Sequence, residues 1–129
     1  MTAELTILAY AGLLQFAQLA LAIVFGDTQT GIKYGLGPRD EPRPFHGMAA
    51  RVDRALSNHY AALGLFTLAV VVITLGEKST PLTVTSAWAY LIARLLYVPA
   101  YMSGIPVLRS LLWSIAFLAT ITMLVVALL

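Results

Sequence analysis

The sequence contains no cysteine among its 129 residues and little charge of either sign. Without cysteine there can be no disulfide, thiolate-bound metal, iron–sulfur cluster or cysteine nucleophile. Charged residues make up 11% of the chain, against about 25% in a soluble domain, and hydrophobic residues make up 60%. So few charges cannot coat a water-facing surface, which excludes an ordinary soluble domain. The net charge of +2 comes from residues near predicted loops and helix ends, so it does not indicate nucleic-acid binding.

Four long apolar runs occupy most of the chain. They lie at residues 5–25, 51–75, 81–101 and 106–129, and each is close to the ~20 residues that cross a ~30 Å hydrocarbon core. Unpaired backbone polar groups are costly in lipid, so runs of this length are predicted to be helices. We therefore expect an all-α fold, an integral membrane four-helix bundle, with residues 1–129 as a single four-span domain. The first run is expected to be a retained span because Met1–Glu4 lacks the basic residues of a signal peptide.

The three connections between the runs differ in length and composition. Residues 26–50 form a long connection rich in glycine and proline. The second connection ends in Thr80–Pro81, an N-cap followed by proline at the first helical position, and Gly104–Pro106 has the same character. These two connections are therefore predicted to be tight turns. Pro99 lies inside the third run and predicts a kink near its end.

Basic residues are distributed unevenly between the two sides of the expected membrane. The first and third connections and the start of the second run contain six of them, whereas the opposite side contains only Lys78. The six are Lys33, Arg39, Arg43, Arg51, Arg54 and Arg109. The positive-inside rule therefore predicts that the first and third connections are cytoplasmic and that both termini are not. The absence of targeting features favours a bacterial inner membrane.

Polar side chains recur at helical spacing near the cytoplasmic ends of three runs. Arg51, Arg54 and Asn58 are at i, i+3 and i+7, and Arg94, Tyr97 and Tyr101 repeat this spacing in the third run. Arg109, Ser110 and Trp113 begin the fourth run. Antiparallel packing should bring all three groups to one depth. The sequence therefore predicts one basic, tyrosine-containing pocket that faces the cytoplasm.

Each of these residues also has a simpler explanation. Arginines near helix ends can snorkel to the interface, and aromatic residues there can form an interfacial belt. Arg94 is deeper and requires an internal partner.

Other polar residues within the runs are expected to hold helices together. Asn58 and the pair Gln15 and Gln18 are predicted to form hydrogen bonds between helices. His59 has no histidine or carboxylate one turn away, so it is expected to pack at an interface, and no metal site is predicted.

A pocket of several guanidiniums and tyrosine hydroxyls suits a ligand with several carboxylates or phosphates, because arginine pairs with such groups bidentately. If the ligand carried a thiol, a neighbouring arginine would favour its nucleophilic thiolate. Apolar clefts between the helices would admit a lipophilic second substrate from the bilayer.

The segment Arg51–Asn58, followed by Leu65–Phe66, resembles the span-two signature of the MAPEG family, the membrane-associated proteins in eicosanoid and glutathione metabolism. The segments Arg94–Tyr101 and Arg109–Trp113 are similar to its later patterns, and Gly37–Pro42 resembles bacterial members. The resemblance covers essentially the whole chain. It implies a four-helix protomer, usually assembled as a trimer, that binds glutathione between protomers on the cytoplasmic side.

The resemblance also implies roles for single residues. Arg51, Arg54 and Asn58 match positions that hold the backbone and carboxylates of glutathione, and Tyr97 and Tyr101 match further contacts. We add Arg94 to this binding set because it shares their spacing. The resemblance makes Arg109 and Ser110 the candidate catalytic pair, which would stabilise the thiolate.

The chain departs from the family pattern at three positions. A glutamate that usually follows the asparagine by three residues, and contacts the amino group of glutathione, is Ala61 here; Ser57 and Gly64 also differ. Loss of that carboxylate leaves the arginines unbalanced and favours an anionic lipid or another anion as an alternative ligand.

Two functions therefore stay open: a glutathione transferase or peroxidase acting on lipophilic substrates, and a non-catalytic protein that binds lipid or fatty acid. A third, a small transporter, is disfavoured because Glu4, Asp53 and Glu77 lie at the ends of the runs rather than inside them.

Overall fold

The computed structural model describes all 129 residues, and its regular structure is entirely helical. Helices α1 (Ala3–Thr30), α3 (Gly47–Leu75), α4 (Pro81–Ser103) and α5 (Pro106–Leu128) are each long and apolar enough to span a membrane. A short helix, α2 (Ile32–Leu36), lies in the first connection. The predicted all-α, four-span membrane bundle is confirmed.

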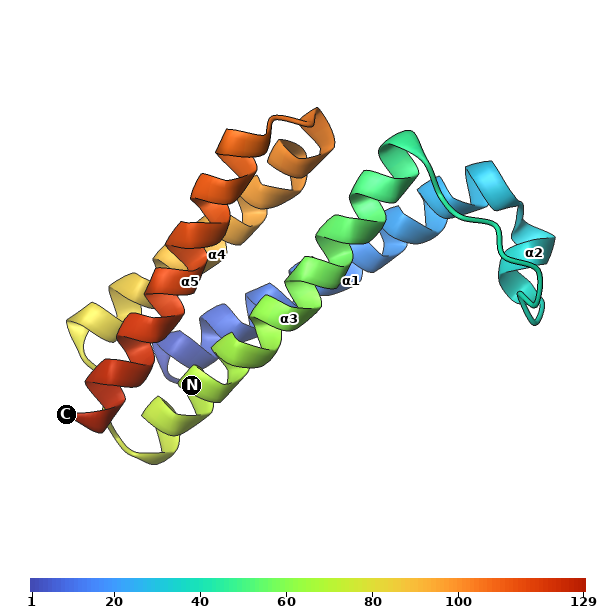
Figure 1. Cartoon of the computed structure of the whole chain (residues 1–129). Helices are drawn as coiled ribbons and strands as arrows, with labels where there is room; N and C mark the ends of the chain where they lie inside the picture. Colours follow the sequence, from blue (N-terminus) through green and yellow to red (C-terminus); the bar gives the residue numbers. More distant parts are fainter.

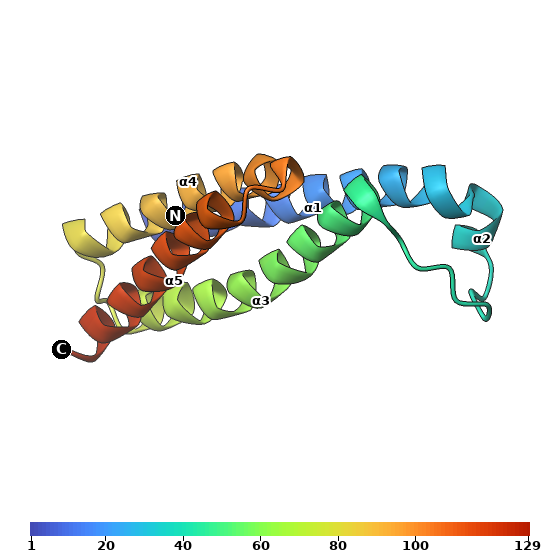
Figure 2. The same cartoon turned by 45° about the horizontal axis from the view of Figure 1, so that its top comes forward.

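The four long helices pack as two close pairs, α1 with α3 and α4 with α5 (Figure 1). Contacts of α3 with α5, of α1 with α4 and of α3 with α4 join the two pairs, whereas α1 and α5 make no contact. Both termini lie at the same end as the α3–α4 turn, which we call the termini end (Figure 1). At the other end, the loop end, α2 and the loop after it project beyond the bundle (Figure 2). The start of α3 and the α4–α5 turn are also at the loop end.

The two tight turns are at the predicted positions, and capping, proline and glycine residues form them. Thr80 caps α4 by accepting the Thr83 backbone N–H at 3.2 Å, and the Thr83 hydroxyl accepts the Thr80 N–H at 2.8 Å. Pro81 follows as the first helical residue. Gly104 ends α4 in the left-handed conformation at φ +77°, and Pro106 begins α5. Helix α4 continues through Pro99 to Ser103 without interruption.

The first connection is shorter than the apolar pattern suggested for residues 26–50. Helix α1 continues past Phe25 to Thr30, and α3 begins at Gly47 rather than Arg51. A helix needs apolar side chains only where it meets lipid, so it can continue through polar residues beyond the hydrocarbon core. The Thr28 and Thr30 hydroxyls donate to the carbonyls of Phe25 and Gly26 at 2.6 and 3.0 Å.

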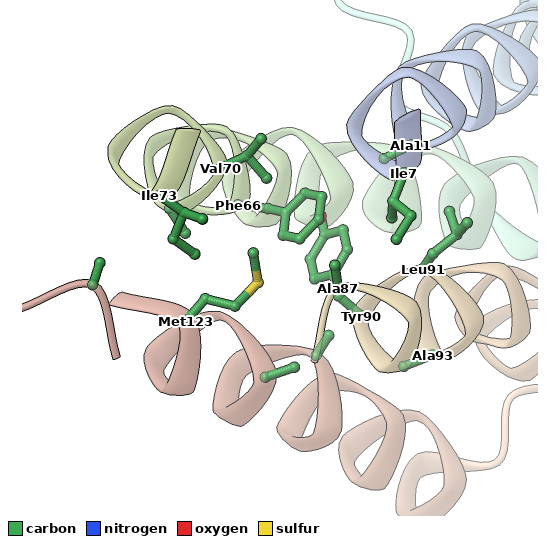
Figure 3. Close-up of a cluster of buried hydrophobic side chains, with 14 residues drawn as sticks. Ile7, Ala11, Phe66, Val70, Ile73, Ala87, Tyr90, Leu91, Ala93 and Met123 are labelled. Atoms are coloured by element: carbon green, nitrogen blue, oxygen red, sulfur yellow. The ribbon is translucent and has the colours of Figure 1, made fainter. Parts of the chain in front are cut away.

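The larger core cluster joins all four long helices (Figure 3). At its centre the rings of Phe66 and Tyr90 stack at 3.9 Å and 5° between α3 and α4. Alanines on every long helix belong to this cluster, and their small side chains allow the helices to approach closely. A smaller cluster nearer the loop end contains Ala55, Tyr97, Ala100 and Leu112. The candidate site lies beside these two clusters.

The outward faces of the bundle are apolar. Leu13, Phe16 and Leu118 are 65%, 69% and 60% exposed, as expected of side chains that meet lipid or another subunit rather than water.

Candidate functional site

A cavity of about 400 Å³ opens near the loop end between α3, α4 and α5. We call it the polar cavity, because most of its lining side chains carry hydrogen-bonding groups. The lining residues are Arg54, Asn58, Tyr97, Tyr101, Arg109, Ser110, Trp113 and Ser114. Six of the eight sequence-predicted site residues therefore line one cavity, and Arg51 and Arg94 do not.

Tyr101 organises the positive charge of the polar cavity. Its hydroxyl accepts the Arg54 Nε–H at 3.0 Å, and the guanidinium carbons of Arg54 and Arg109 lie 5.7 and 5.0 Å from its ring centre. The Tyr97 ring meets the Tyr101 ring edge-on at 5.6 Å. One tyrosine thus holds guanidiniums from α3 and α5 in the same cavity, where both can face an anion.

Arg51 lies beside the polar cavity and serves the α4–α5 turn. Its Nη1 donates to the carbonyl of Met102 at 3.1 Å, at the carboxyl end of α4, where a cation is favourable. It lines an adjoining hollow of about 190 Å³ together with Arg54, Tyr101 and Arg109.

Arg94 is completely buried on α4. Its Nη1 donates to Asn58 Oδ1 at 2.8 Å, and its guanidinium lies 4.2 Å from the centre of the Tyr97 ring. Its Nε and Nη2 have no hydrogen-bond partner. The internal partner predicted for Arg94 is therefore Asn58 on α3, and this bond also provides the predicted hydrogen bond between helices.

A second cavity, of about 300 Å³, lies beside the polar cavity between the same helices. We call it the apolar cavity, because nine of its twelve lining residues are hydrophobic. The lining residues are Asn58, Ala61, Ala62, Leu65, Tyr90, Arg94, Trp113, Ala116, Phe117, Thr120, Ile121 and Leu124. Asn58 and Trp113 line both cavities, so the two are adjacent.

Neither cavity contains a carboxylate. The chain has one ion pair, between Arg43 and Glu41 at 3.9 Å in the first connection, so Arg54, Arg94 and Arg109 have no acidic partner. The positive charge of the site is therefore uncompensated within the chain.

The structure assigns two residues, Tyr90 and Glu4, to positions that were not predicted from the sequence. Tyr90, one turn before Arg94, lines the apolar cavity, and its hydroxyl has no partner; extending the Arg94–Tyr97 face by one turn would have found it. Glu4 was expected only at the end of a run, yet it is completely buried. Its Oε1 accepts the hydroxyls of Ser79 and Thr83, each at 2.7 Å, which ties α1 to the start of α4.

The predictions for the other polar residues within the spans were partly wrong. The amide of Gln18 and Oε1 of Gln15 are buried without partners, so the hydrogen bonds predicted for this pair are not formed within the chain. His59 is buried, and its Nε2 lies 3.2 Å from the carbonyl of Ala11 on α1. The chain has no group of three or more His, Cys, Asp or Glu side chains that could hold a metal ion.

Comparison with models of known families matches the chain to the MAPEG family over residues 7–129. Searches of curated proteins and of solved structures gave no match.

Proposed function

The chain belongs to the MAPEG family, and from this premise we propose that it is a glutathione transferase or peroxidase that acts on lipophilic substrates in the membrane. The observation that carries the proposal is the shared wall of the two cavities at Asn58 and Trp113. This arrangement suits a water-soluble anionic thiol in the polar cavity and a lipophilic partner in the apolar cavity. Both reactants would then lie within reach of one another, which removes much of the entropic cost of bringing them together.

Within the polar cavity the residues divide by the group that they would hold. Arg54, Asn58 and Tyr101 offer hydrogen-bond donors to the carboxylates of the tripeptide, and Tyr97 adds a further polar contact. Arg109 and Ser110, adjacent at the start of α5, would stabilise the thiolate through a positive charge and a hydroxyl. Arg51 and Arg94 would not contact the ligand. Arg51 would position the α4–α5 turn, and Arg94 would position Asn58.

The chemistry follows from the thiolate. In the transferase reaction its sulfur forms a bond to an electrophilic carbon, and the leaving group departs with the bonding electron pair. In the peroxidase reaction the sulfur attacks the terminal oxygen of a hydroperoxide. The O–O bond breaks as the S–O bond forms, and the alkoxide leaves as an alcohol after protonation. A second thiol then reduces the resulting sulfenic acid, giving a disulfide and water.

A test of this proposal compares Arg109→Ala with the wild type in detergent-purified protein. We expect glutathione-dependent turnover of an aryl halide or lipid hydroperoxide to fall about 100-fold, since one stabilising donor at a developing or reacting anion has roughly this effect. Lys78→Ala is the matched control, because it removes an exposed positive charge at the termini end and should leave turnover unchanged. Folded wild-type protein without thiol-dependent activity over a broad panel of electrophiles and hydroperoxides would argue against an enzyme.

A second candidate function, non-catalytic binding of an anionic lipid or fatty acid, is favoured by one specific observation. Ala61 places a methyl group, rather than a carboxylate, in the wall of the apolar cavity next to Asn58. An anionic head group at the arginines and an acyl chain in the apolar cavity would then fit together. Native mass spectrometry should detect co-purified lipid, and its loss in Arg54→Ala together with absent thiol turnover would favour this function.

We further propose that the chain acts as a homotrimer in a bacterial inner membrane. Ala61 and Trp113, which line the cavities, are themselves exposed in the single chain, so a neighbouring protomer could close the open side of the site. The excess of basic residues at the loop end supports a cytoplasmic position for that end and a non-cytoplasmic position for both termini.

A further inference from the structure

We infer that the polar cavity offers the ammonium group of its thiol co-substrate no favourable contact, so that a thiol-bearing polycarboxylate without this group binds at least as tightly as glutathione. The inference rests on the proposed function and specifies the thiol co-substrate. It follows from three properties of the cavity: the absence of carboxylates, the occupation of its aromatic rings, and the sign of its charge.

All six acidic residues of the chain lie outside both cavities. Glu4 and Glu77 are at the termini end, Asp27 and Asp53 line a separate cavity beside α2, and Asp40 and Glu41 are in the loop that follows α2. An ammonium group usually binds in a protein through a carboxylate. Within one chain, no side chain that lines the polar or apolar cavity can supply one.

An ammonium group can also bind over an aromatic ring, but the rings of the polar cavity are already engaged. The Tyr101 ring has the guanidiniums of Arg54 and Arg109 within 5.7 Å, and the Tyr97 ring has that of Arg94 at 4.2 Å. The Trp113 ring stacks on Phe117 at 4.9 Å. Each of the three rings is therefore paired with a cation or with another ring.

The arginines of the polar cavity would repel an ammonium group. Arg54 and Arg109 flank the cavity without acidic partners, and an ammonium group placed near them meets like charge. Carboxylates of the same ligand meet the opposite sign. A ligand with carboxylates and no ammonium group therefore keeps the whole attraction and avoids the repulsion.

The test compares two tripeptides that differ in one group. Isothermal titration calorimetry of the wild-type protein in lipid nanodiscs measures glutathione and glutaryl-cysteinyl-glycine, in which hydrogen replaces the α-amino group. We expect the analogue to bind at least as tightly as glutathione. This result differs from that of a site with a dedicated carboxylate, where removing the amine would weaken binding.

A substitution at Ala61 should shift the relative affinity toward glutathione. Ala61 follows Asn58 by one helical turn and lines the adjoining apolar cavity, so Ala61→Glu adds a carboxylate at the junction of the two cavities. We expect the affinity of glutathione relative to the analogue to rise up to about fivefold, the effect of a partly solvated ion pair. Ala61→Gln is the control of matched size and should leave the ratio unchanged.

The outcomes separate the two proposals. Wild-type protein that binds glutathione more than fivefold tighter than the analogue overturns the inference and leaves the proposed function intact. Protein that is folded by circular dichroism yet binds neither thiol overturns both. Binding of the analogue alone supports the inference and overturns glutathione as the co-substrate of the proposed function. If Ala61→Glu does not fold, the wild-type comparison decides.

Discussion

Arg94 has the largest of the completely buried side chains of the protein, and it carries a charge into the interior of a membrane bundle. Removing an ion from water costs several kcal/mol even after relaxation of the surroundings. One hydrogen bond to Asn58 and the face of Tyr97 offset part of this cost. Asn58 is therefore the principal partner of the Arg94 charge, and it also lines both cavities.

This arrangement predicts unequal effects of removing either partner. Asn58→Leu leaves the buried guanidinium without its hydrogen bond and should lower the free energy of unfolding by about 3–5 kcal/mol. Arg94→Met removes the charge itself and leaves one amide unpaired, so it should cost only about 1–3 kcal/mol. Chemical denaturation of the purified protein in detergent measures both values.

The double variant tests the same pairing. Since both unpaired groups are then absent, Asn58→Leu with Arg94→Met should be more stable than Asn58→Leu alone. Equal destabilisation by the two single variants, or strictly additive effects, would show that the pair does not control the stability of this region.

At the scale of the elements, the α4–α5 turn positions the site. It places Arg109 and Ser110 in the first two turns of α5, next to the last turns of α4 that carry Tyr97 and Tyr101. Gly104 makes this reversal at φ +77°, and a Cβ atom built on it would lie 3.1 Å from the Arg51 guanidinium. The turn therefore requires glycine for its backbone conformation, and a Cβ atom there would displace the Arg51 guanidinium by a few tenths of an ångström.

Gly104→Ala should lower the free energy of unfolding by about 1–2 kcal/mol, because an L-residue is strained in the left-handed conformation. It should also weaken anion binding, since Arg51 and Arg109 both depend on this turn. Gly12→Ala is the comparison: the glycine lies within α1 and has no atom within 4 Å of the added Cβ. That change should stabilise the helix by about 0.5–1 kcal/mol. Thermal unfolding of both variants, followed by circular dichroism, would contradict the prediction if Gly104→Ala were as stable as Gly12→Ala.

On the scale of the whole molecule, the two ends of the bundle differ in chemistry. The loop end carries the polar cavity and nearly all the basic residues, and the termini end carries the Glu4–Ser79–Thr83 contact. Between them the outer surface is apolar. Such a molecule can cross a bilayer in either direction on hydrophobic grounds, so the charges must decide its orientation.

The absence of native cysteine allows a direct measurement of this orientation. Asp40→Cys and Lys78→Cys place single thiols at exposed positions of the loop end and the termini end. In intact spheroplasts, a membrane-impermeant maleimide should label Lys78→Cys, whereas Asp40→Cys should react only after permeabilisation. Labelling of Asp40→Cys in intact spheroplasts would reverse the proposed orientation and place the polar cavity outside the cytoplasm.

The amino-acid sequence by itself determined the four spans, the two tight turns and the family. Spans follow from local composition, because the free energy of transferring an apolar side chain into lipid depends mainly on that side chain and little on its tertiary contacts. The Thr80–Pro81 cap and the Gly104 turn are equally local, since they depend on neighbouring residues. The grouping of Arg54, Asn58, Tyr101 and Arg109 was predictable because their helical spacing coincided with the ends of antiparallel spans.

The tertiary structure alone decided which polar groups meet. Arg94 pairs with Asn58, and Arg51 turns to the α4 carboxyl end. Glu4, which was placed only at the end of a run, is buried and accepts the hydroxyls of Ser79 and Thr83. It also placed Arg94 in the wall of the apolar cavity and Arg51 beside the polar cavity, although the sequence predicted that both would line one basic pocket. These outcomes depend on the rotation and separation of neighbouring helices, which arise from packing between residues far apart in the chain, so spacing along one helix cannot specify them.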